Sequence, residues 1–321
     1  SVEACARLGA GEEFASLSAE QVRARCSSPR LGAGAFMRAS ATVQPARLVL
    51  GLRDALVRAG VGVHEHTRAR RIEARADGVI VETDGGRVLA PAAVVAINAA
   101  AAGFRPLRGR IAVTSTHMVI TEQVPDVLER AGWTADECIS TAGTYLNYFR
   151  TTPDRRIAFG WGGGRIAYGA RLGGRIQDDA EIAERLRADL LTFFPELGDR
   201  RIAGAWGGPI DVSPTHLPIF GSRRRVHHGF GFTGNGVGPA HLAGRIIASL
   251  ALDRRDELTR LALVEPSHAP VPPEPIRYLG GTLVRAALVR KEEREDAGRE
   301  ADPLTSLVVD LPRRLGIHIG R

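Results

Sequence analysis

The chain has 321 residues and a formal net charge of +7, with 44% apolar and 25% charged residues. These values are ordinary for a globular protein and exclude a disordered or fibrous chain. The length predicts about two domains with a sizeable core. The longest uncharged apolar run, residues 92–104, is shorter than the ~18 residues that a membrane span needs. The chain begins without methionine, and we expect further residues upstream.

The cysteines and histidines indicate neither a disulfide framework nor a metal site. Cys5, Cys26 and Cys138 are odd in number and far apart, which favours free thiols in a reducing cytoplasm. His64 and His66 would share one face of a strand, but no third ligand follows at a fitting distance. We therefore expect a cytoplasmic protein without a metal.

The basic charge alone would suggest a nucleic-acid partner. However, Lys291 is the only lysine among the 43 basic residues, a bias that GC-rich codon usage is sufficient to explain. The densest basic cluster, residues 223–228, has Phe230 and Phe232 nearby, and basic surfaces with aromatic residues can bind single strands. A single such cluster is more often a solvated loop, so we expect no nucleic-acid partner.

The first part of the chain combines helices with short strands. Residues 1–30 are expected to be helical, with Ser18 as an N-cap. Pro45 opens a second predicted helix, which Gly60 ends. One face of this helix is predicted to be core, because its apolar residues recur at helical spacing: Leu48, Leu52, Ala55, Leu56 and Ala59.

Four short strands are predicted next, at residues 61–67, 70–76, 78–84 and 87–99. Turns at Asp77-Gly78 and Gly85-Gly86 separate the later strands. The last strand contains a continuous apolar run, residues 94–97, which predicts a fully buried parallel strand.

The second part begins with alternating strands and loops from about Arg105 to Trp206, interrupted by one helix over 178–194. A proline-studded loop is expected at residues 209–221, and a glycine-rich segment then leads into an apolar helix over 240–252. Beyond it we expect a proline-rich linker from Pro266 to Pro275, then a tail with a charged, solvated helix.

Residues 229–234 formally match G-x-G-x-x-G and precede a helix. A dinucleotide-binding unit also needs a second parallel strand after that helix, with an acidic residue at its end. Here the helix runs into a charged segment and the linker, so this is not a pyrophosphate loop. The cluster still offers a helix N-terminus whose free N–H groups suit a negatively charged ligand atom. The alternative is a glycine-rich turn that only allows tight packing.

The order of several segments resembles the D-amino-acid-oxidase-like family of flavoproteins, which includes glycine, sarcosine and gamma-glutamylputrescine oxidases. Trp206-Gly207-Gly208 and Asn235 are most similar to the gamma-glutamylputrescine oxidoreductase branch. The segments that carry the resemblance are residues 41–52, 63–73, 86–99, 148–164, 206–221 and 229–248.

The resemblance implies an α/β fold of mixed α+β character with two domains. The first is a three-layer FAD-binding domain lacking its first βαβ portion, formed by residues 41–104 and 207–265. The second is a substrate domain with a mixed, largely antiparallel sheet, formed by residues 1–40 and 105–206, and residues 266–321 are a linker and tail. The family's own G-x-G-x-x-G lies upstream of anything in this chain. The chain is therefore expected to be a fragment, or a degenerate relative that has lost pyrophosphate binding.

The resemblance also implies non-covalent FAD, because Gly207 and Gly208 stand where relatives with covalent flavin carry a cysteine. Its glycine loop, residues 234–238, would lie over the pyrimidine edge of the flavin, with backbone angles of positive φ open to its glycines. There the helix dipole would stabilise the reduced ring. The implied cofactor-binding residues are Ala69, Ala96, Ile97, Asn98, Thr233, Gly234, Asn235, Gly236, Val237 and Gly238.

The implied chemistry is oxidation of the C–N bond of an amine or amino acid by hydride transfer to flavin, followed by hydrolysis of the imine. Oxygen or another molecule would accept the electrons; the lysine that some oxidases hold near the flavin has no counterpart, since Lys291 lies in the tail. Candidate substrate-pocket residues are Tyr145, Tyr148, Arg150, Trp161 and Trp206, although aromatic residues on strands are usually core. The alternative function is a non-catalytic remnant or interaction module that has lost FAD.

Overall fold

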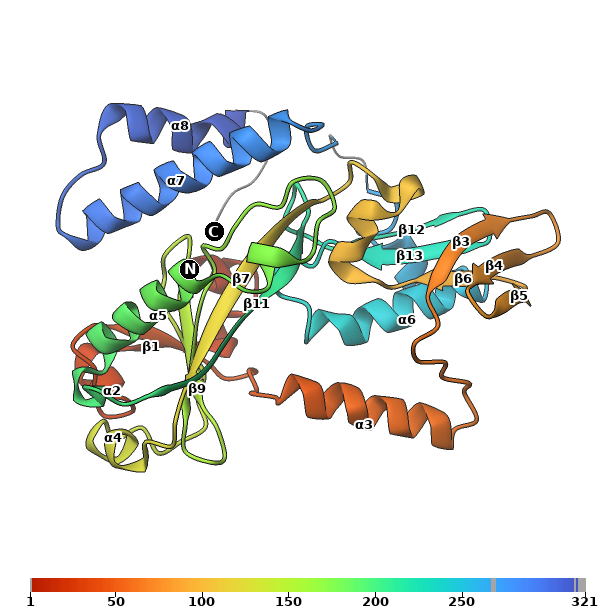
Figure 1. Ribbon diagram of the computed structural model, residues 1–321. Coiled ribbons are helices and arrows are strands. Elements are labelled where there is room, and N and C mark those ends of the chain that lie inside the picture. Colours follow the sequence, from red (N-terminus) through yellow and green to blue (C-terminus); the bar gives the residue numbers. More distant parts are fainter. Residues whose placement is uncertain (1, 267–269, 315, 317–321) are drawn as a thin grey trace. The chain divides into compact units, whose positions relative to one another are not determined.

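The computed structural model describes residues 2–266, 270–314 and 316 and divides into two compact units. Unit 1 comprises residues 1–43, 115–164 and 173–208, and unit 2 comprises residues 44–114, 165–172 and 209–321. Two long strands, β7 (Ala112–Thr121) and β11 (Ile202–Val212), contribute residues to both units. Figure 1 labels the elements of both.

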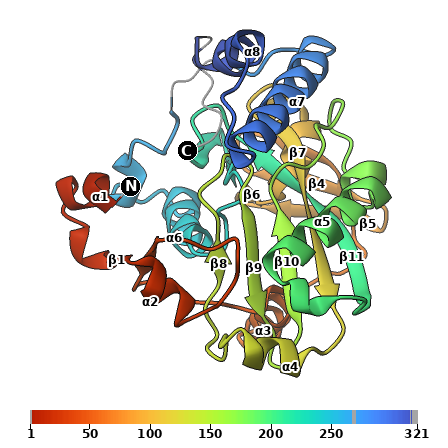
Figure 2. The same ribbon diagram turned by 90° about the vertical axis from the view of Figure 1, so that its left-hand side faces the viewer.

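Unit 1 is built on a five-stranded sheet with the order β11-β7-β10-β9-β8. Its shorter strands are β8 (Ile139–Ser140), β9 (Asn147–Thr151) and β10 (Ile157–Trp161). Strand β10 pairs antiparallel with both β7 and β9, and β9 pairs antiparallel with β8. Helix α5 (Ala180–Phe193) lies against one face of this sheet (Figure 2), and the short helix α4 (Pro125–Arg130) follows β7.

An aromatic cluster fills the space between the sheet of unit 1 and α5. Phe149 of β9 and Phe159 of β10 stack at 5.4 Å between ring centroids. Phe193, at the end of α5, packs on both rings, while Trp133 stacks on Phe194 at 5.7 Å. All five side chains are buried, and they form the centre of the unit's core.

The N-terminal segment is only partly helical, so the expectation of a helix over residues 1–30 is wrong. Helices α1 (Val2–Arg7) and α2 (Ala19–Arg23) are short, and β1 (Phe14–Leu17) between them pairs antiparallel with β2 (Gly34–Met37). The predicted N-cap is confirmed: the Ser18 hydroxyl accepts the Gln21 N–H, and the Gln21 side chain accepts the Ser18 N–H. This capping box fixes the start of α2.

Unit 2 contains two three-stranded sheets. The first is the antiparallel meander of β3 (Ala69–Ala74), β4 (Val79–Thr83) and β5 (Gly86–Ala90). The second has the order β12-β13-β6, with β12 at Ile219–Arg223, β13 at Val226–Phe230 and β6 at Ala93–Val95. Strand β13 pairs antiparallel with β12 and parallel with β6, so the predicted parallel strand is confirmed at Val94 and Val95, but residues 96–97 lie beyond its end.

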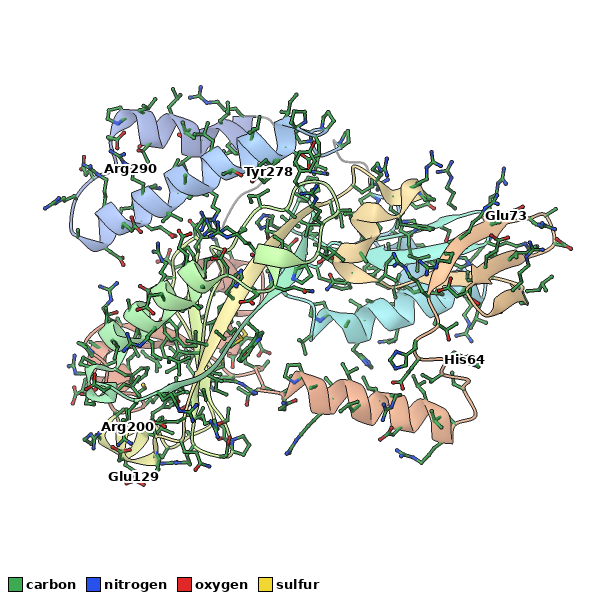
Figure 3. All side chains as sticks on the ribbon, viewed as in Figure 1. His64, Glu73, Glu129, Arg200, Tyr278 and Arg290 are labelled. Carbon is green, nitrogen blue, oxygen red and sulfur yellow. The ribbon has the colours of Figure 1, made fainter. Side chains whose placement is uncertain are left out.

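Three expectations for the strands of unit 2 need correction. Residues 61–67 form no strand, because a turn at Glu65–His66 with φ +54° at His66 breaks the extended backbone; His64 is labelled in Figure 3. Full burial of the parallel strand is also wrong, since Val94 of β6 is 48% exposed. The proline-studded segment 209–221 is mostly strand, because β11 lies at a sheet edge where Pro209 interrupts no ladder.

The helices of unit 2 differ in burial. Helix α3 (Pro45–Arg58) begins at Pro45 as predicted, but its expected core face is exposed and none of its residues is buried. By contrast, α6 (Pro239–Ala251) buries Ala243, Ile246 and Ile247 in a cluster with Phe220 of β12. The tail contains α7 (Ile276–Asp296) and α8 (Pro303–Arg314). No helix in the described ranges is long and apolar enough to cross a membrane.

The aromatic cluster predicts a large stability loss on truncation of Phe149. Phe149→Ala leaves a cavity among four rings, and we expect the free energy of unfolding to fall by about 3–5 kcal/mol in urea titration. The control is Leu8→Ala, since Leu8 is exposed and should change stability by less than about 0.5 kcal/mol. Equal losses in both variants would contradict this description of the core.

Unit 2 should lose stability in acid because of His228 on β13. Burial lowers the pKa of His228 to about 4. The positive charges of Arg110 and His227 also lower this pKa, whereas the negative charge of Glu265 raises it. As the pH falls from about 6.5 to about 4, the His228 side chain takes up a proton in the unfolded chain but not in the folded one. The free energy of unfolding therefore falls, by on the order of 2–3 kcal/mol in total. Melting temperatures at pH 7 and pH 5 should show a smaller acid loss for His228→Gln than for the wild type. The same loss in both proteins would refute this role.

Candidate functional site

The parallel pairing of β6 with β13 brings two candidate segments to one edge of a sheet. Val95 of β6 pairs with His228 of β13, and both strands then run toward the same edge. Residues 96–98 follow β6 directly, and the loop 231–238 follows β13. Open sheets with parallel strands bind ligands at this carboxyl edge. The structure thus brings nine of the ten predicted cofactor residues to the same edge of this sheet.

The loop 231–238 has a strained first half and an open second half. Gly231 and Gly234 have φ near +82°, and Thr233 has φ +52°. Gly236 and Gly238 do not have positive φ, so the backbone freedom expected of the loop's glycines is needed only at its start. Asn235, Val237 and Gly238 are exposed.

The second half of this loop carries free backbone donors. In the described chain, no hydrogen bond engages the N–H groups of Gly234, Gly236, Val237 or Gly238. Helix α6 begins immediately afterwards with Pro239, and its N-cap Gly238 supplies no side chain to cap it. Free donors together with the positive end of the α6 dipole suit an electron-rich ligand edge. A flavin pyrimidine ring, whose N1 and O2 gain negative charge on reduction, fits this donor set.

Ala69 lies apart from these segments in the sequence and in a different sheet of unit 2. It begins β3, where the pairing with β4 shifts register between Ala69 and Arg71. The side chain is exposed, and only its backbone distinguishes the position. Nothing in the sheet pairing brings Ala69 together with the loop.

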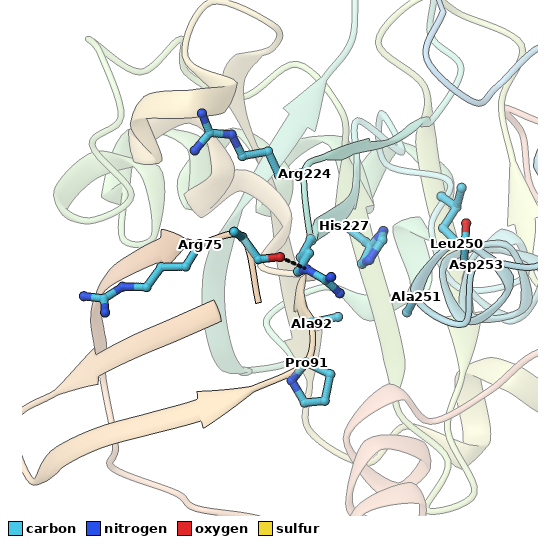
Figure 4. Close-up of a pocket in the computed structure, with 10 residues that line it drawn as sticks. Arg75, Pro91, Ala92, Arg224, His227, Leu250, Ala251 and Asp253 are labelled. Atoms are coloured by element: carbon cyan, nitrogen blue, oxygen red, sulfur yellow. Dashed lines mark hydrogen bonds between the residues drawn. The ribbon is translucent and has the colours of Figure 1, made fainter. Parts of the chain in front are cut away.

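A cavity of about 740 Å³ in unit 2 lies at the opposite end of the parallel strands (Figure 4). Its lining includes Pro91 and Ala92 before β6, Arg225 and His227 at the start of β13, and Asp253 after α6. The Arg225 Nε donates to the Ala76 carbonyl at 3.2 Å. Arg75 and Arg224 also line it, so three arginines face one carboxylate and the lining is predominantly basic.

The basic cluster 223–228 forms the hairpin between β12 and β13. Phe230 behind it is fully buried and Phe232 packs on the core around Phe220. Neither ring is therefore displayed beside the arginines as a stacking surface for bases.

In unit 1, the sheet face opposite α5 holds Tyr148 as its central polar group. Its ring lies over Gly160, where a Cβ would clash with it. The Tyr148 hydroxyl and the Thr116 hydroxyl form a short hydrogen bond, and Thr116 also donates to the Trp161 carbonyl at 3.0 Å. Burial raises the pKa of Tyr148 above its usual value, so the phenol stays protonated at neutral pH.

Arg150 and Trp206 share this open face with Tyr148. Arg150 lies two residues after Tyr148 on β9, so its side chain is on the same face of the sheet. Its Nη1 donates to the Val43 carbonyl at 2.7 Å. Trp206 of β11 is 45% exposed. It lies two residues after Gly204, where a Cβ would meet Ile120 on the face that holds Tyr148, so Trp206 is on that face as well. Three of the five substrate-pocket candidates therefore lie on one face.

Trp161 lies on the other face, against α5. It is 3% exposed, and the Arg185 guanidinium of α5 sits 4.2 Å from its ring centroid. Tyr145 packs edge-on against Trp161 at 6.0 Å. The arrangement makes Trp161 a packing residue that supports Tyr145.

Thr116, Gly160 and Asp211 contact the candidate site residues but are not identified by the sequence patterns. Thr116 stands in an ordinary alternating strand, and Gly160 in an apolar one. Asp211 lay in the expected loop, yet its buried carboxylate accepts the N–H of Gly231 in a short hydrogen bond. Its only visible signal was an isolated acid between Ile210 and Val212 in an apolar run.

Comparison with known proteins identifies the family. The model of the FAD dependent oxidoreductase family matches residues 1–250. The probable oxidoreductase OrdL of Rhizobium meliloti is 28% identical over 77% of this chain and 54% of its own length. The gamma-glutamylputrescine oxidoreductase of Escherichia coli is 30% identical over 73% of this chain and 53% of its own length. The chain therefore spans about half the length of these two relatives.

Among solved structures, glycine oxidase from Geobacillus kaustophilus has a similar fold, with a TM-score of 0.67 and 19% identity. The match covers 82% of this chain and 69% of the oxidase. This similarity supports the mixed α/β architecture found in the two units.

Proposed function

The chain belongs to the family of FAD-dependent oxidoreductases, and we propose that the protein uses FAD to oxidise the C–N bond of a small amine or amino acid. The observation that carries this proposal is the loop 231–238, with its unengaged N–H groups at the start of α6. The names of the relatives, an oxidoreductase of gamma-glutamylputrescine among them, support an amine as the substrate.

FAD would be held by unit 2, corresponding to the FAD-binding domain predicted from residues 41–104 and 207–265. Residues 234–238 would face the pyrimidine edge, residues 96–98 the ribose and pyrophosphate region, and the Ala69 backbone the adenine. All three cysteines are free and lie in unit 1, and Gly207 and Gly208 replace a flavin-linking cysteine, which supports non-covalent binding.

Bound FAD would supply the hydride acceptor, to which a neutral amine would give the hydride of its α carbon before water hydrolyses the imine. The protein's task is to position the amine and exclude water. On the open face of unit 1, Trp206 offers an aromatic surface for a substrate cation or alkyl chain, and Tyr148 offers a hydroxyl oriented by Thr116.

The electron acceptor is proposed to be oxygen or another molecule, and no lysine in the flavin-binding segments is available to assist reaction with oxygen. The sole lysine, Lys291, lies on α7, 3.7 Å from the Glu295 carboxylate. We further propose a cytoplasmic location on the basis of the free thiols, and no nucleic-acid partner because Phe230 is buried and Phe232 packs on the core.

Purification of the protein from its complete reading frame tests the proposed function. We expect a yellow protein whose FAD is released intact by acid denaturation, and whose visible flavin absorption bleaches when an amine is added without air. Screening should include polyamine derivatives, small amino acids and aminophosphonates. A colourless, folded protein that binds no added FAD would support the non-catalytic alternative instead.

Substitutions in the glycine loop separate cofactor contact from packing. A Cβ at Gly236 meets Phe232 only at an ordinary 3.4 Å, and the residue has no positive φ, so Gly236→Val should keep the melting temperature. In contact with the flavin, the valine should weaken FAD binding at least tenfold or slow flavin reduction in stopped flow.

Gly234→Ala serves as the comparison, because φ +82° makes a side chain cost about 1–2 kcal/mol there without any ligand. It should lower the melting temperature. Normal FAD binding and reduction in Gly236→Val would show that this loop is not the cofactor site.

A further inference from the structure

We propose that the carboxylate of Asp211 is a positioning residue that holds the backbone of the FAD loop in its binding conformation before FAD arrives. This inference rests on the proposed function, because the loop's ligand is the FAD proposed above. Asp211 itself would not touch the cofactor; it would act through residues 231–233, the first half of the loop.

The first observation is the environment of the carboxylate. Asp211 lies at the end of β11 and is 2% exposed. Its Oδ2 accepts the Gly231 N–H, and the N–H groups of Phe232 and Thr233 also act on the carboxylate to favour its ionised form. The Thr233 N–H lies 3.1 Å from the Asp211 carbonyl oxygen as well. Asp211 thus bonds two positions of the loop, Gly231 through its carboxylate and Thr233 through its backbone carbonyl.

The backbone of the loop has the shape that such a contact requires. Successive N–H groups converge on one point when the chain passes through positive-φ positions, which creates a concave site for an anion. Gly231 and Thr233 have φ of +82° and +52°. The Asp211 carboxylate occupies this concavity from within the protein, so that it orders the loop without a bound anion.

Neighbouring groups reinforce the same half of the loop. The Ser213 N–H donates to the Thr233 hydroxyl at 3.2 Å, and the Thr233 hydroxyl lies 3.2 Å from the Gly231 carbonyl oxygen. A Cβ at Gly231 would approach Ser213 to 3.1 Å, so the two segments are in close contact. The start of the loop is therefore fixed on the segment 211–213, while the N–H groups of Gly234, Gly236, Val237 and Gly238 stay unengaged in the described chain.

Burial of this carboxylate opposes its ionisation: desolvation is the largest influence on the pKa of Asp211 and raises it above 3.8. An apolar side chain would avoid that cost but would leave the N–H groups of the turn without an acceptor. The Asp211 carboxylate therefore loses its hydration, and in return its hydrogen bonds fix the backbone of the loop. Ligand binding gains from such pre-ordering because less conformational freedom remains to be lost.

The variant that tests this role is Asp211→Asn in the protein from its complete reading frame. The amide keeps the shape and one acceptor oxygen, but it removes the negative charge and replaces the second acceptor with an Nδ2 donor, which faces the N–H groups at the start of the loop unfavourably. We expect FAD binding to weaken at least tenfold, measured by fluorescence titration, and the visible spectrum of the remaining bound flavin to shift.

Asp256→Asn is the matched control. Asp256 is also in unit 2 and accepts backbone N–H groups, those of Leu258 at 3.0 Å and Thr259 at 3.1 Å, but it lies beyond α6. It should lower the melting temperature while changing the dissociation constant for FAD by less than twofold. An Asp211→Asn protein that binds FAD as tightly as the control would overturn the positioning role, with the proposed function intact.

Amide hydrogen exchange of the wild type tests the same inference without any variant. In the absence of FAD, the amides of residues 231–233 should already exchange slowly, and added FAD should slow those of residues 234–238. Protection of residues 231–233 that appears only with FAD would refute the pre-ordering. If the wild type binds no FAD at all, the proposed function itself fails, and the positioning role fails with it.

Discussion

The parallel pairing of β6 with β13 is the constraint on which the candidate cofactor site depends. These strands are far apart in the sequence, and three paired positions align them so that both run to the same edge. Because they are parallel, the loops that follow them must leave from that edge. An antiparallel arrangement would send residues 96–98 and the loop 231–238 to opposite ends. The pairing also places the start of α6 beside that edge, since the helix follows the loop without a further strand.

Helices α3 and α6 show which part of a fold a sequence pattern can predict. Both have one apolar stripe at helical spacing, and both begin with a proline that suits the first turn, so their existence and limits could be predicted. Burial depends on a partner, which the pattern does not contain. Helix α6 has β12 and β13 beneath it and buries Ile246 and Ile247, whereas Leu52 of α3 is 55% exposed. An apolar stripe therefore predicts a surface that requires a partner without identifying it.

The substrate-pocket candidates show the same limit for strands. Tyr148 and Trp161 each stand on a predicted strand, and side-chain alternation within each strand is evident from the sequence. Which alternating set faces α5 depends on the register between strands: Asn147 pairs with Trp161, and Tyr148 with Gly160. A shift of one residue would exchange the faces. Neither the order of the segments nor the glycine at position 160 specifies the register between the strands. The sequence could therefore identify the aromatic residues but not the sheet face on which each one lies.

Asp211 escaped prediction for a related reason. Prolines at positions 209 and 214 suggested a loop, in which an aspartate is unremarkable. Strand β11 instead runs to Val212 and carries the carboxylate into the interior, where its ionised form is costly unless backbone donors surround it. Those donors come from a segment some 20 residues later, whose glycines the sequence pattern interprets either as room for a ligand or as a tightly packed turn. The glycine at 231 thus meets two demands, because its positive φ turns the chain and its N–H faces the aspartate. The positive φ explains its residue type, and the buried carboxylate explains why the turn stays in place without a ligand.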